Sequence, residues 1–490
     1  MNLKILYITL GILSTELLAA QNQTMEMSLE QVVKIARLES PDARTARHSF
    51  RSAYWNYKYY RANYLPSLSL SSDPNLNCAI NKITMGDGSV KFVEQNLLNT
   101  DLTLNLSQNI PWTGGSLFLE TSAQRMDLFS EHKYSWQTSP IMIGYRQSLF
   151  GYNSLKWDKR IEPVRYQEAK KSYVETLELV SANAINKFFA LATAQSNYDI
   201  ASFNYANADT LYRYAQGRYN IGTITENEML QLELNRLTEE TNRMNARIEM
   251  DNCMQELRSY LGIQEEREIR VRVSSRIPDF SINLNEALAL AYENSPDIQT
   301  MKRRKLESES AVARARANAG LKADIYLRFG LTQTADKLPE AYRNLLDQQY
   351  VSLSISLPIL DWGRGKGQVR VARSNRDLVY TQVEQNRTDF ELNVRKLVKQ
   401  FNLQTQRVRI AARTDETAQR RNEVARKLYI LGKSTILDLN ASISEKDSAR
   451  RNYVSALYNY WSLYYTLRSM TLYDFESNKL LTEDYNLLIE

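Results

Sequence analysis

The stretch LEQVVKIARLESPD, residues 29–42, is matched in pattern by LNEALALAYENSPD, residues 284–297. The two stretches share their apolar spacing and a Ser-Pro-Asp ending, at an offset of 255 in the numbering. Further on the offset becomes 210 and holds without a gap, from Lys156 with Lys366 onward. Self-similarity at a fixed offset indicates one structural unit used twice. The chain is therefore predicted to be a tandem internal duplication.

The two offsets, 255 and 210, differ by 45, so the first copy carries extra sequence between about Tyr64 and Gln147. An additional hairpin or a long surface loop is expected there, and a longer strand pair is the alternative. The later match is gapless because an insertion in a helix would rotate every following side chain by about 100°. Long regular helices are therefore expected after the extra sequence.

Composition limits the functions that the chain can have. Only 16 Gly and 10 Pro among 490 residues favour long helices over turn-rich folds. Two cysteines, Cys78 and Cys253, cannot build a disulfide framework, and His48 and His132 cannot supply a His-rich metal site. Free thiols and no metal or cofactor are expected. A net charge of +6 with interspersed charges gives no support for nucleic-acid binding, whereas 30 Tyr are typical of membrane interfaces.

The predicted domains follow the duplication. Residues 1–20 are typical of a secretory signal peptide, with Lys4, an apolar run and then Ala19-Ala20 before polar residues. A buried N-terminal helix is the alternative, but the polar residues after Ala20 break its pattern. The expected order is a first repeat at 21–263, a linker at 264–280, a second repeat at 281–472 and a tail at 473–490.

Several short segments alternate polar and apolar residues, as strands with two different faces do. The clearest are 67–71, 101–107 and 351–357, with weaker candidates at 117–122 and 141–148 and a turn at 111–115. A water-filled membrane barrel requires this alternation, and a soluble β-domain with one solvated face is the alternative. Beyond residue 20 no window has the roughly 18 to 20 apolar residues of a spanning helix, so strands would have to span a membrane.

The longest segments are helical by their local signals. Residues 155–218 and 367–428 could each run on the order of 90 to 100 Å at about 1.5 Å per residue. Each reaches a break with a glycine, Gly222 or Gly432, and then continues as a second long helix. Both copies are thus predicted to contain a long antiparallel helical hairpin. A Tyr, Leu and Ala stripe from Leu191 to Tyr212 is interpreted as packing core.

The order of helix, strands and long hairpin, repeated twice, resembles the TolC family of outer-membrane efflux channels over about residues 25–475. The local features are the strand-to-helix turn LPILDWG at 357–363, its weaker partner QSLFG at 147–151 and the hydrophobic-Gly hairpin tips. The resemblance implies a mainly helical fold with β-structure, in which three copies share one transmembrane β-barrel and one helical tunnel.

The same resemblance implies a function. The homotrimer would lie in outer-membrane lipid with a long periplasmic tunnel. It would pass substrates from an inner-membrane transporter and a periplasmic adaptor, a membrane fusion protein, to the exterior. Such a protein is a channel and not an enzyme. The alternative is a non-channel periplasmic coiled-coil scaffold, which would need neither alternating strands nor a signal segment.

The hairpin tips carry the candidate sites. Glu228 and Asp438 each lie six residues past their glycine and match an acidic family position, so the resemblance implies a periplasmic gate there. The alternative is a charge favoured by the helix N-terminus. Ser434 and Ala441 depart from the family pattern of gate-locking residues. The region that family adaptors dock on corresponds to Ile221, Gly222, Thr223, Leu431, Gly432, Lys433 and Ser434.

Overall fold

The computed structural model describes residues 25–489 except 266 and 432. The chain divides into two compact units. The first takes the chain up to Arg51, Ala169–Ile298 and the chain from Arg387 onward, and the second takes Ser52–Glu168 and Gln299–Asn386. Each unit therefore combines segments from both predicted repeats, whose boundaries stay a prediction.

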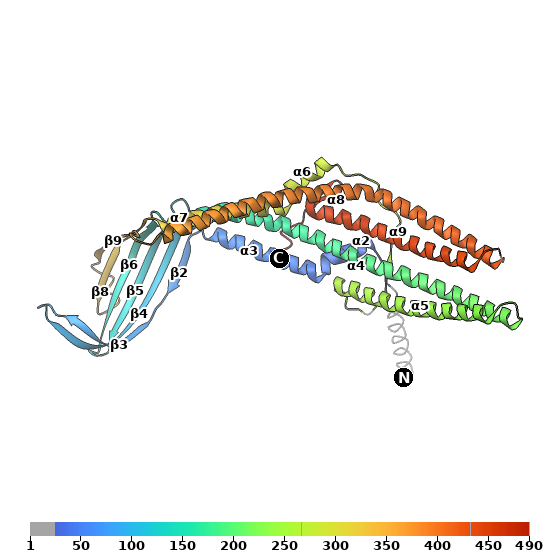
Figure 1. Ribbon diagram of the computed structural model, residues 1–490. Coiled ribbons are helices and arrows are strands. Elements are labelled where there is room, and N and C mark those ends of the chain that lie inside the picture. Colours follow the sequence, from blue (N-terminus) through green and yellow to red (C-terminus); the bar gives the residue numbers. More distant parts are fainter. Residues whose placement is uncertain (1–24, 266, 432, 490) are drawn as a thin grey trace, which may run out of the picture. The chain divides into compact units, whose positions relative to one another are not determined.

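The helices repeat in the order and at the two offsets that the sequence predicts (Figure 1). Helices α6 and α7 follow α2 and α3 at the first offset, and α8 and α9 follow α4 and α5 at the second. Helices α4 and α8 have 67 residues each, and α5 and α9 have 36 each. The bounds are α2 Leu29–Glu39, α3 Pro41–Ala62, α4 Ser154–Asn220, α5 Glu226–Leu261, α6 Leu284–Asn294, α7 Pro296–Ala319, α8 Arg364–Ile430 and α9 Ile436–Thr471.

The repeated Ser-Pro-Asp motif is a break between two helices. Ser40 leaves α2 in an extended conformation, and Pro41 begins α3. Proline suits a first helical position because it has no N–H to satisfy and its φ is already helical. Ser295 and Pro296 separate α6 from α7 in the same way. The motif thus ends one helix and starts the next within a single residue.

The second unit contains a seven-stranded antiparallel sheet, in the order β2-β4-β5-β6-β8-β9 with β3 paired to β4 (Figure 1). All five predicted strand segments fall in it, although β9 ends at Ser356, two residues before Pro358, which has no N–H to donate to a neighbouring strand. The extra sequence of the first copy lies within residues 75–128, which form β3, β4 and β5. The bounds are β2 Ser67–Ser71, β3 Asn75–Thr84, β4 Val90–Ile110, β5 Gly115–Leu128, β6 Lys133–Ser148, β8 Lys322–Ala335 and β9 Leu346–Ser356.

Two short pairings complete the first unit. Strand β1, Met25–Ser28, pairs in parallel with β7, Ile269–Arg272, so a paired strand lies within the predicted linker. Strands β10, Tyr473–Asp474, and β11, Lys479–Leu480, form a small hairpin in the C-terminal tail. The start of the chain's described part and its tail are therefore both anchored by backbone pairing.

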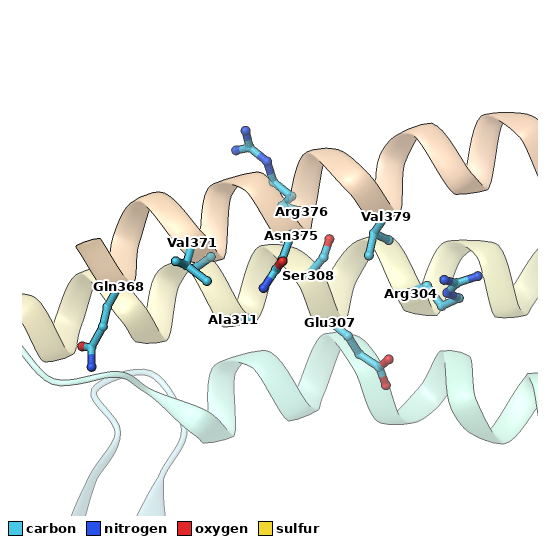
Figure 2. A pocket seen from close by; sticks show the side chains of 10 residues that line it. Arg304, Glu307, Ser308, Ala311, Gln368, Val371, Asn375, Arg376 and Val379 are labelled. Atoms are coloured by element: carbon cyan, nitrogen blue, oxygen red, sulfur yellow. The ribbon is translucent and has the colours of Figure 1, made fainter. Parts of the chain in front are cut away.

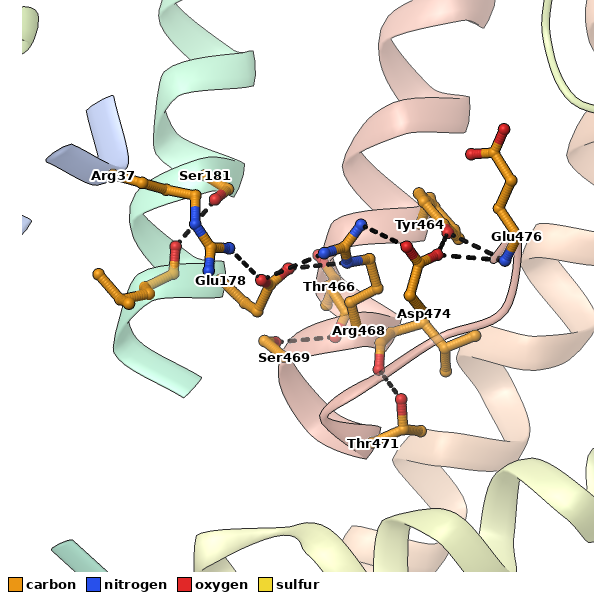
Figure 3. Close-up of polar contacts among 12 residues, drawn as sticks. Arg37, Glu178, Ser181, Tyr464, Thr466, Arg468, Ser469, Thr471, Asp474 and Glu476 are labelled. Carbon is orange, nitrogen blue, oxygen red and sulfur yellow. Dashed lines mark hydrogen bonds and ion pairs between the residues drawn. The ribbon is translucent and has the colours of Figure 1, made fainter. Parts of the chain in front are cut away.

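A buried ion cluster joins three helices and the tail in the first unit (Figure 3). The Glu178 side chain on α4 is fully buried. It accepts hydrogen bonds from Arg37 on α2 and from Arg468 on α9, whose Nε lies 2.8 Å from Glu178 Oε2. Arg468 Nη1 also lies 3.5 Å from Asp474 Oδ2, and the Tyr464 hydroxyl donates to Asp474. Glu178 therefore pairs with both guanidinium groups, and Arg37 also pairs with Glu483 in the tail at 2.7 Å.

Charge pairing outweighs burial in this cluster. Burial alone would lower the pKa of Arg468, but the Glu178 carboxylate beside it raises the pKa overall. Burial alone would raise the pKa of Asp474, but the hydrogen bond from Tyr464 and the charge of Arg468 lower it. The charged forms are therefore favoured, and removing one partner leaves an uncompensated buried charge.

We expect Glu178→Gln to lower the free energy of unfolding by about 3 to 5 kcal/mol, because both arginines lose their fully buried counter-charge. Arg37 then keeps only Glu483 and Arg468 only Asp474, and both of these carboxylates are partly exposed. Urea unfolding of the purified protein, followed by its helical circular dichroism, measures this. Glu256→Gln is the matched control, since Glu256 pairs with Lys187 at 2.8 Å and both side chains are well exposed. The control substitution should lower the free energy of unfolding by less than about 1 kcal/mol. Equal losses in the two variants would refute the importance of the cluster.

Candidate functional site

One face of the seven-stranded sheet is apolar and exposed. Cross-strand pairing puts Leu68 beside Leu106, Leu106 beside Leu119 and Leu119 beside Ile143, so these side chains share a face. Soluble monomers rarely expose a contiguous apolar patch of this extent. Its exposed members include Leu68, Leu70, Leu102, Leu104, Leu106, Leu117, Leu119, Ile143, Phe329, Val351, Leu353 and Ile355.

The opposite face of the same sheet is polar. Glu120 on β5 and Arg328 on β8 form an ion pair of 3.3 Å across it. The Arg146 guanidinium lies 5.4 Å from the centre of the Tyr326 ring. Small polar side chains fill much of the remaining area, among them Ser67, Ser69, Ser71, Thr103, Asn105, Ser107, Ser352 and Ser354. The sheet therefore has one face suited to lipid and one suited to water.

The predicted strand-to-helix turn at 357–363 is held by Asp361. Its Oδ1 accepts from Gly363 N at 2.9 Å and its Oδ2 from Gly365 N at 2.8 Å. These hydrogen bonds, first from Gly365 and then from Gly363, lower the pKa of Asp361. Gly363 has φ 83°, which favours glycine. The aspartate of the motif thus caps α8, because it accepts hydrogen bonds from N–H groups that the start of a helix leaves free.

The first hairpin tip ends α4 in a left-handed turn at Gly222, with φ 74°. Gly222 N donates to Tyr219 O at 2.8 Å, and Thr223 N donates to Arg218 O at 2.9 Å. Both bonds satisfy carbonyls that a helix end leaves free. Ile221 at this turn is 74% exposed. The tip therefore presents an exposed apolar side chain on a hydrogen-bonded backbone turn.

The second tip repeats this design at the corresponding positions of the second copy. Lys433 N donates to Leu428 O at 2.9 Å, as Thr223 does to Arg218 in the first tip. Leu431 is 67% exposed. Gly432, the predicted glycine of this turn, lies outside the described residues, while Ser434 is half-buried. Docking of an adaptor at the two tips stays a prediction.

Both predicted gate acids lie in helix capping boxes. Glu228 Oε2 accepts from Thr225 N at 3.0 Å, and Thr225 Oγ1 accepts from Glu228 N at 3.3 Å. Asp438 makes the same reciprocal pair with Thr435, and the hydroxyl of Thr435 also donates to Asp438 at 2.7 Å. These bonds from Thr435 lower the pKa of Asp438. Both acids therefore have a capping role, and their role in a gate stays a prediction.

Three arginine side chains of α5 lie over tyrosine rings of α4 and join the two helices. These contacts are not predicted from the sequence. Tyr198, Tyr205 and Tyr212 recur with a heptad spacing on α4. Their rings lie 5.6, 4.2 and 5.5 Å from guanidinium groups on α5, which belong to Arg247, Arg243 and Arg236 respectively. The predicted stripe is thus a buried core only at its Leu and Ala positions, such as Leu191, Ala194, Ala201 and Ala208. The signal was available in the similar spacing of Tyr on one helix and Arg on the other.

The cavity between α7 and α8 holds no catalytic grouping. Side chains of α7 and α8 line a cavity of about 470 Å³ in the second unit, including Arg304, Glu307, Val371 and Asn375 (Figure 2). No nucleophile and base are paired there. In the described part of the chain, no three His, Cys, Asp or Glu side chains gather where a metal ion could bind. Among the helices described here, none is both long and apolar enough to cross a membrane.

Comparisons with known proteins agree with this architecture. Residues 287–471 match the sequence model of the family described as outer membrane efflux protein. Outer membrane protein TolC of Escherichia coli strain K12 is 21% identical over 447 residues, which cover 88% of this chain and 80% of that protein.

Two solved structures share the fold over most of their length. The Campylobacter jejuni CmeC outer membrane channel has a TM-score of 0.66 at 16% identity, covering 94% of this chain and 88% of CmeC. The outer membrane protein VceC of Vibrio cholerae has a TM-score of 0.63 at 14% identity, covering 90% of this chain and 95% of VceC. At these identities the likeness concerns the fold alone.

The turn at Gly222 gives a direct test of the tip geometry. Gly222→Ala should strain the turn by about 1 to 2 kcal/mol, because Cβ disfavours the left-handed region. Gly217→Ala is the matched control, since a Cβ meets open space at both positions and only Gly222 has positive φ. Hydrogen exchange of the amides at 218–225 should accelerate in the first variant and stay the same or slow in the second. Equal exchange in both would contradict a strained turn.

Proposed function

We propose that this chain is a member of the outer membrane efflux protein family and that it is the outer-membrane channel of a tripartite export system. Three copies share one barrel in the outer membrane and one tunnel in the periplasm. Substrates enter from an inner-membrane transporter through a periplasmic adaptor and leave to the exterior. The chain acts as a conduit, with no reaction and no cofactor of its own.

The two-faced sheet is the observation that carries this proposal. Leu104 and Leu106 lie exposed on its apolar face, while Glu120 and Arg328 pair on its polar face. A membrane barrel needs lipid-facing and water-facing residues in alternation. Within the described residues the sheet path ends at β2 and β9. Lipid cannot satisfy such backbone edges, so copies of the chain close the barrel together.

The helical hairpins supply the tunnel. Helices α4 and α8 are far longer than an ordinary globular helix of about 11 residues. Each is followed by a 36-residue partner, α5 or α9, after a tight turn. The exposed Ile221 and Leu431 at these turns suit an apolar contact with the adaptor. We propose the two turns as the docking sites.

Native mass measurement in detergent should give a trimer, and the purified protein should form ion-conducting pores in planar bilayers. The physical reason is that the edges of β2 and β9 must be paired in lipid. The protein should also fractionate with the outer membrane, whereas a periplasmic scaffold would appear in the soluble fraction. A monomer that still inserts into bilayers and conducts ions would refute the proposal.

We further propose that Glu228 and Asp438 form the periplasmic gate in addition to capping their helices. Three copies would bring six carboxylates around one opening. Like charges held close together favour cations and raise one another's pKa. The carboxylate oxygens that bond to Thr225 and Thr435 would keep these side chains oriented at the tips.

The double change Glu228→Gln with Asp438→Asn should weaken cation selectivity and the block by polyvalent cations added at the periplasmic side. Side-chain size is kept, so the trimer should remain intact. Glu226→Gln is the control, because Glu226 is an exposed acid in the same first turn of α5 but lies outside the capping pair. Single-channel recording measures all three proteins. Unchanged selectivity and block in the double variant would assign both acids to capping alone.

A further inference from the structure

The two halves of the chain contribute unequally to the sheet. Strands β2 and β8 begin at Ser67 and Lys322, which correspond to each other at the first offset of the duplication. Strands β6 and β9 lead into α4 and α8, whose starts correspond at the second offset. Thus β2 corresponds to β8, and β6 corresponds to β9. Strands β4 and β5 belong to the first half only and have no counterpart in the second.

These two additional strands are full members of the sheet wall. They pair with each other from Leu97 with Leu128 to Ile110 with Gly115 and separate β2 from β6. Both continue the apolar face, where Leu106 lies beside Leu119. They also continue the polar face, because Glu120 on β5 reaches Arg328 on β8. A surface decoration would not need to match both faces of the sheet.

Strands β2 and β3 lie along the same edge of β4. The break between them, residues 72–74, stays attached to β4, because Ser72 Oγ donates to Asp101 O at 2.6 Å and Asp73 N donates to Asp101 Oδ1 at 3.0 Å. Together they form one interrupted edge strand. Its stretch from Ser67 to Asn77 is as long as a membrane-spanning strand, which needs roughly 9 to 11 residues.

The edge strand has the two faces expected of a barrel wall. Leu68 and Leu70 point to the apolar face beside Leu106 and Leu104 and are well exposed. Ser67 Oγ lies 2.8 Å from Ser107 Oγ on the polar face. A mere connector between α3 and the wall would not require this alternation. We therefore count β2 with β4, β5, β6, β8 and β9.

We propose that each copy supplies six strands to the barrel, so that three copies close an eighteen-stranded wall through β2 of one copy and β9 of the next. This inference rests on the proposed channel function and deepens it. Barrel diameter grows with strand number, and barrels of sixteen to eighteen strands enclose an aqueous channel. The β4–β5 hairpin thereby widens the exit, which fits bulky, water-soluble cargo.

Cysteine cross-linking between copies tests the order of strands. In a background of Cys78→Ser and Cys253→Ala, Leu70→Cys on β2 is combined in turn with Val351→Cys, Leu353→Cys or Ile355→Cys on β9. Val351, Leu353 and Ile355 lie at every second position of β9, on its apolar face, so the three pairs test three registers against Leu70. A disulfide needs Cβ atoms within about 4.5 Å, and neighbouring strands are about 4.8 Å apart. Only cysteines on directly neighbouring strands can therefore form one.

The matched control places the cysteine at Leu104, directly opposite Leu70 on the same face but one strand further in. Oxidation should give covalent dimers and trimers with Leu70→Cys and none with Leu104→Cys. Cross-linking through Leu104→Cys instead would overturn the inference, because β4 would then be the edge of the wall. A conducting trimer that cross-links through neither position would overturn it as well.

The channel function and the strand number fail in distinguishable ways. A protein that is monomeric and does not conduct contradicts the proposed function itself. A conducting trimer with the wrong cross-link contradicts only the strand order. Electron microscopy of the trimer in lipid nanodiscs provides an independent count. Eighteen strands support the inference, and any smaller number refutes it.

Discussion

A backbone edge cannot remain unpaired in lipid, and most of this protein's architecture depends on that constraint. The sheet alternates Leu with Ser, Thr or Asn so that one face suits lipid and the other suits water. Its path ends at β2 and β9 among the described residues. In the proposed assembly, other copies of the chain complete the wall, so oligomerisation and membrane insertion are one requirement.

Helices and strands tolerate extra sequence differently, which explains where the two halves diverge. An insertion within α4 or α8 would rotate every later side chain away from its partners, and both helices keep 67 residues. An added hairpin such as β4–β5 disturbs only the order of neighbours in a sheet. The helical parts have thus stayed equal in length, while the strands differ in number.

Charges are placed according to burial. Glu178 is fully buried and pairs with Arg37 and Arg468. Removing any one of these charges would strongly lower the free energy of unfolding. Glu228 and Asp438 are exposed and bond within their own turns. The first arrangement ties α2, α4 and α9 to the tail, and the second leaves charge at the tips. Stability and the proposed gate therefore depend on different acids.

The sequence by itself determined the duplication, the long hairpins, the two-faced strands and the acids at the tips, because periodicity and fixed offsets are properties of local chain geometry. Only the tertiary structure decided the sheet order, the ion cluster around Glu178 and the arginines stacked on Tyr198, Tyr205 and Tyr212. Those features join residues far apart in the chain, and Arg37 and Arg468 look like ordinary surface charges in the sequence. Their partners are chosen by packing, which one-dimensional patterns do not encode.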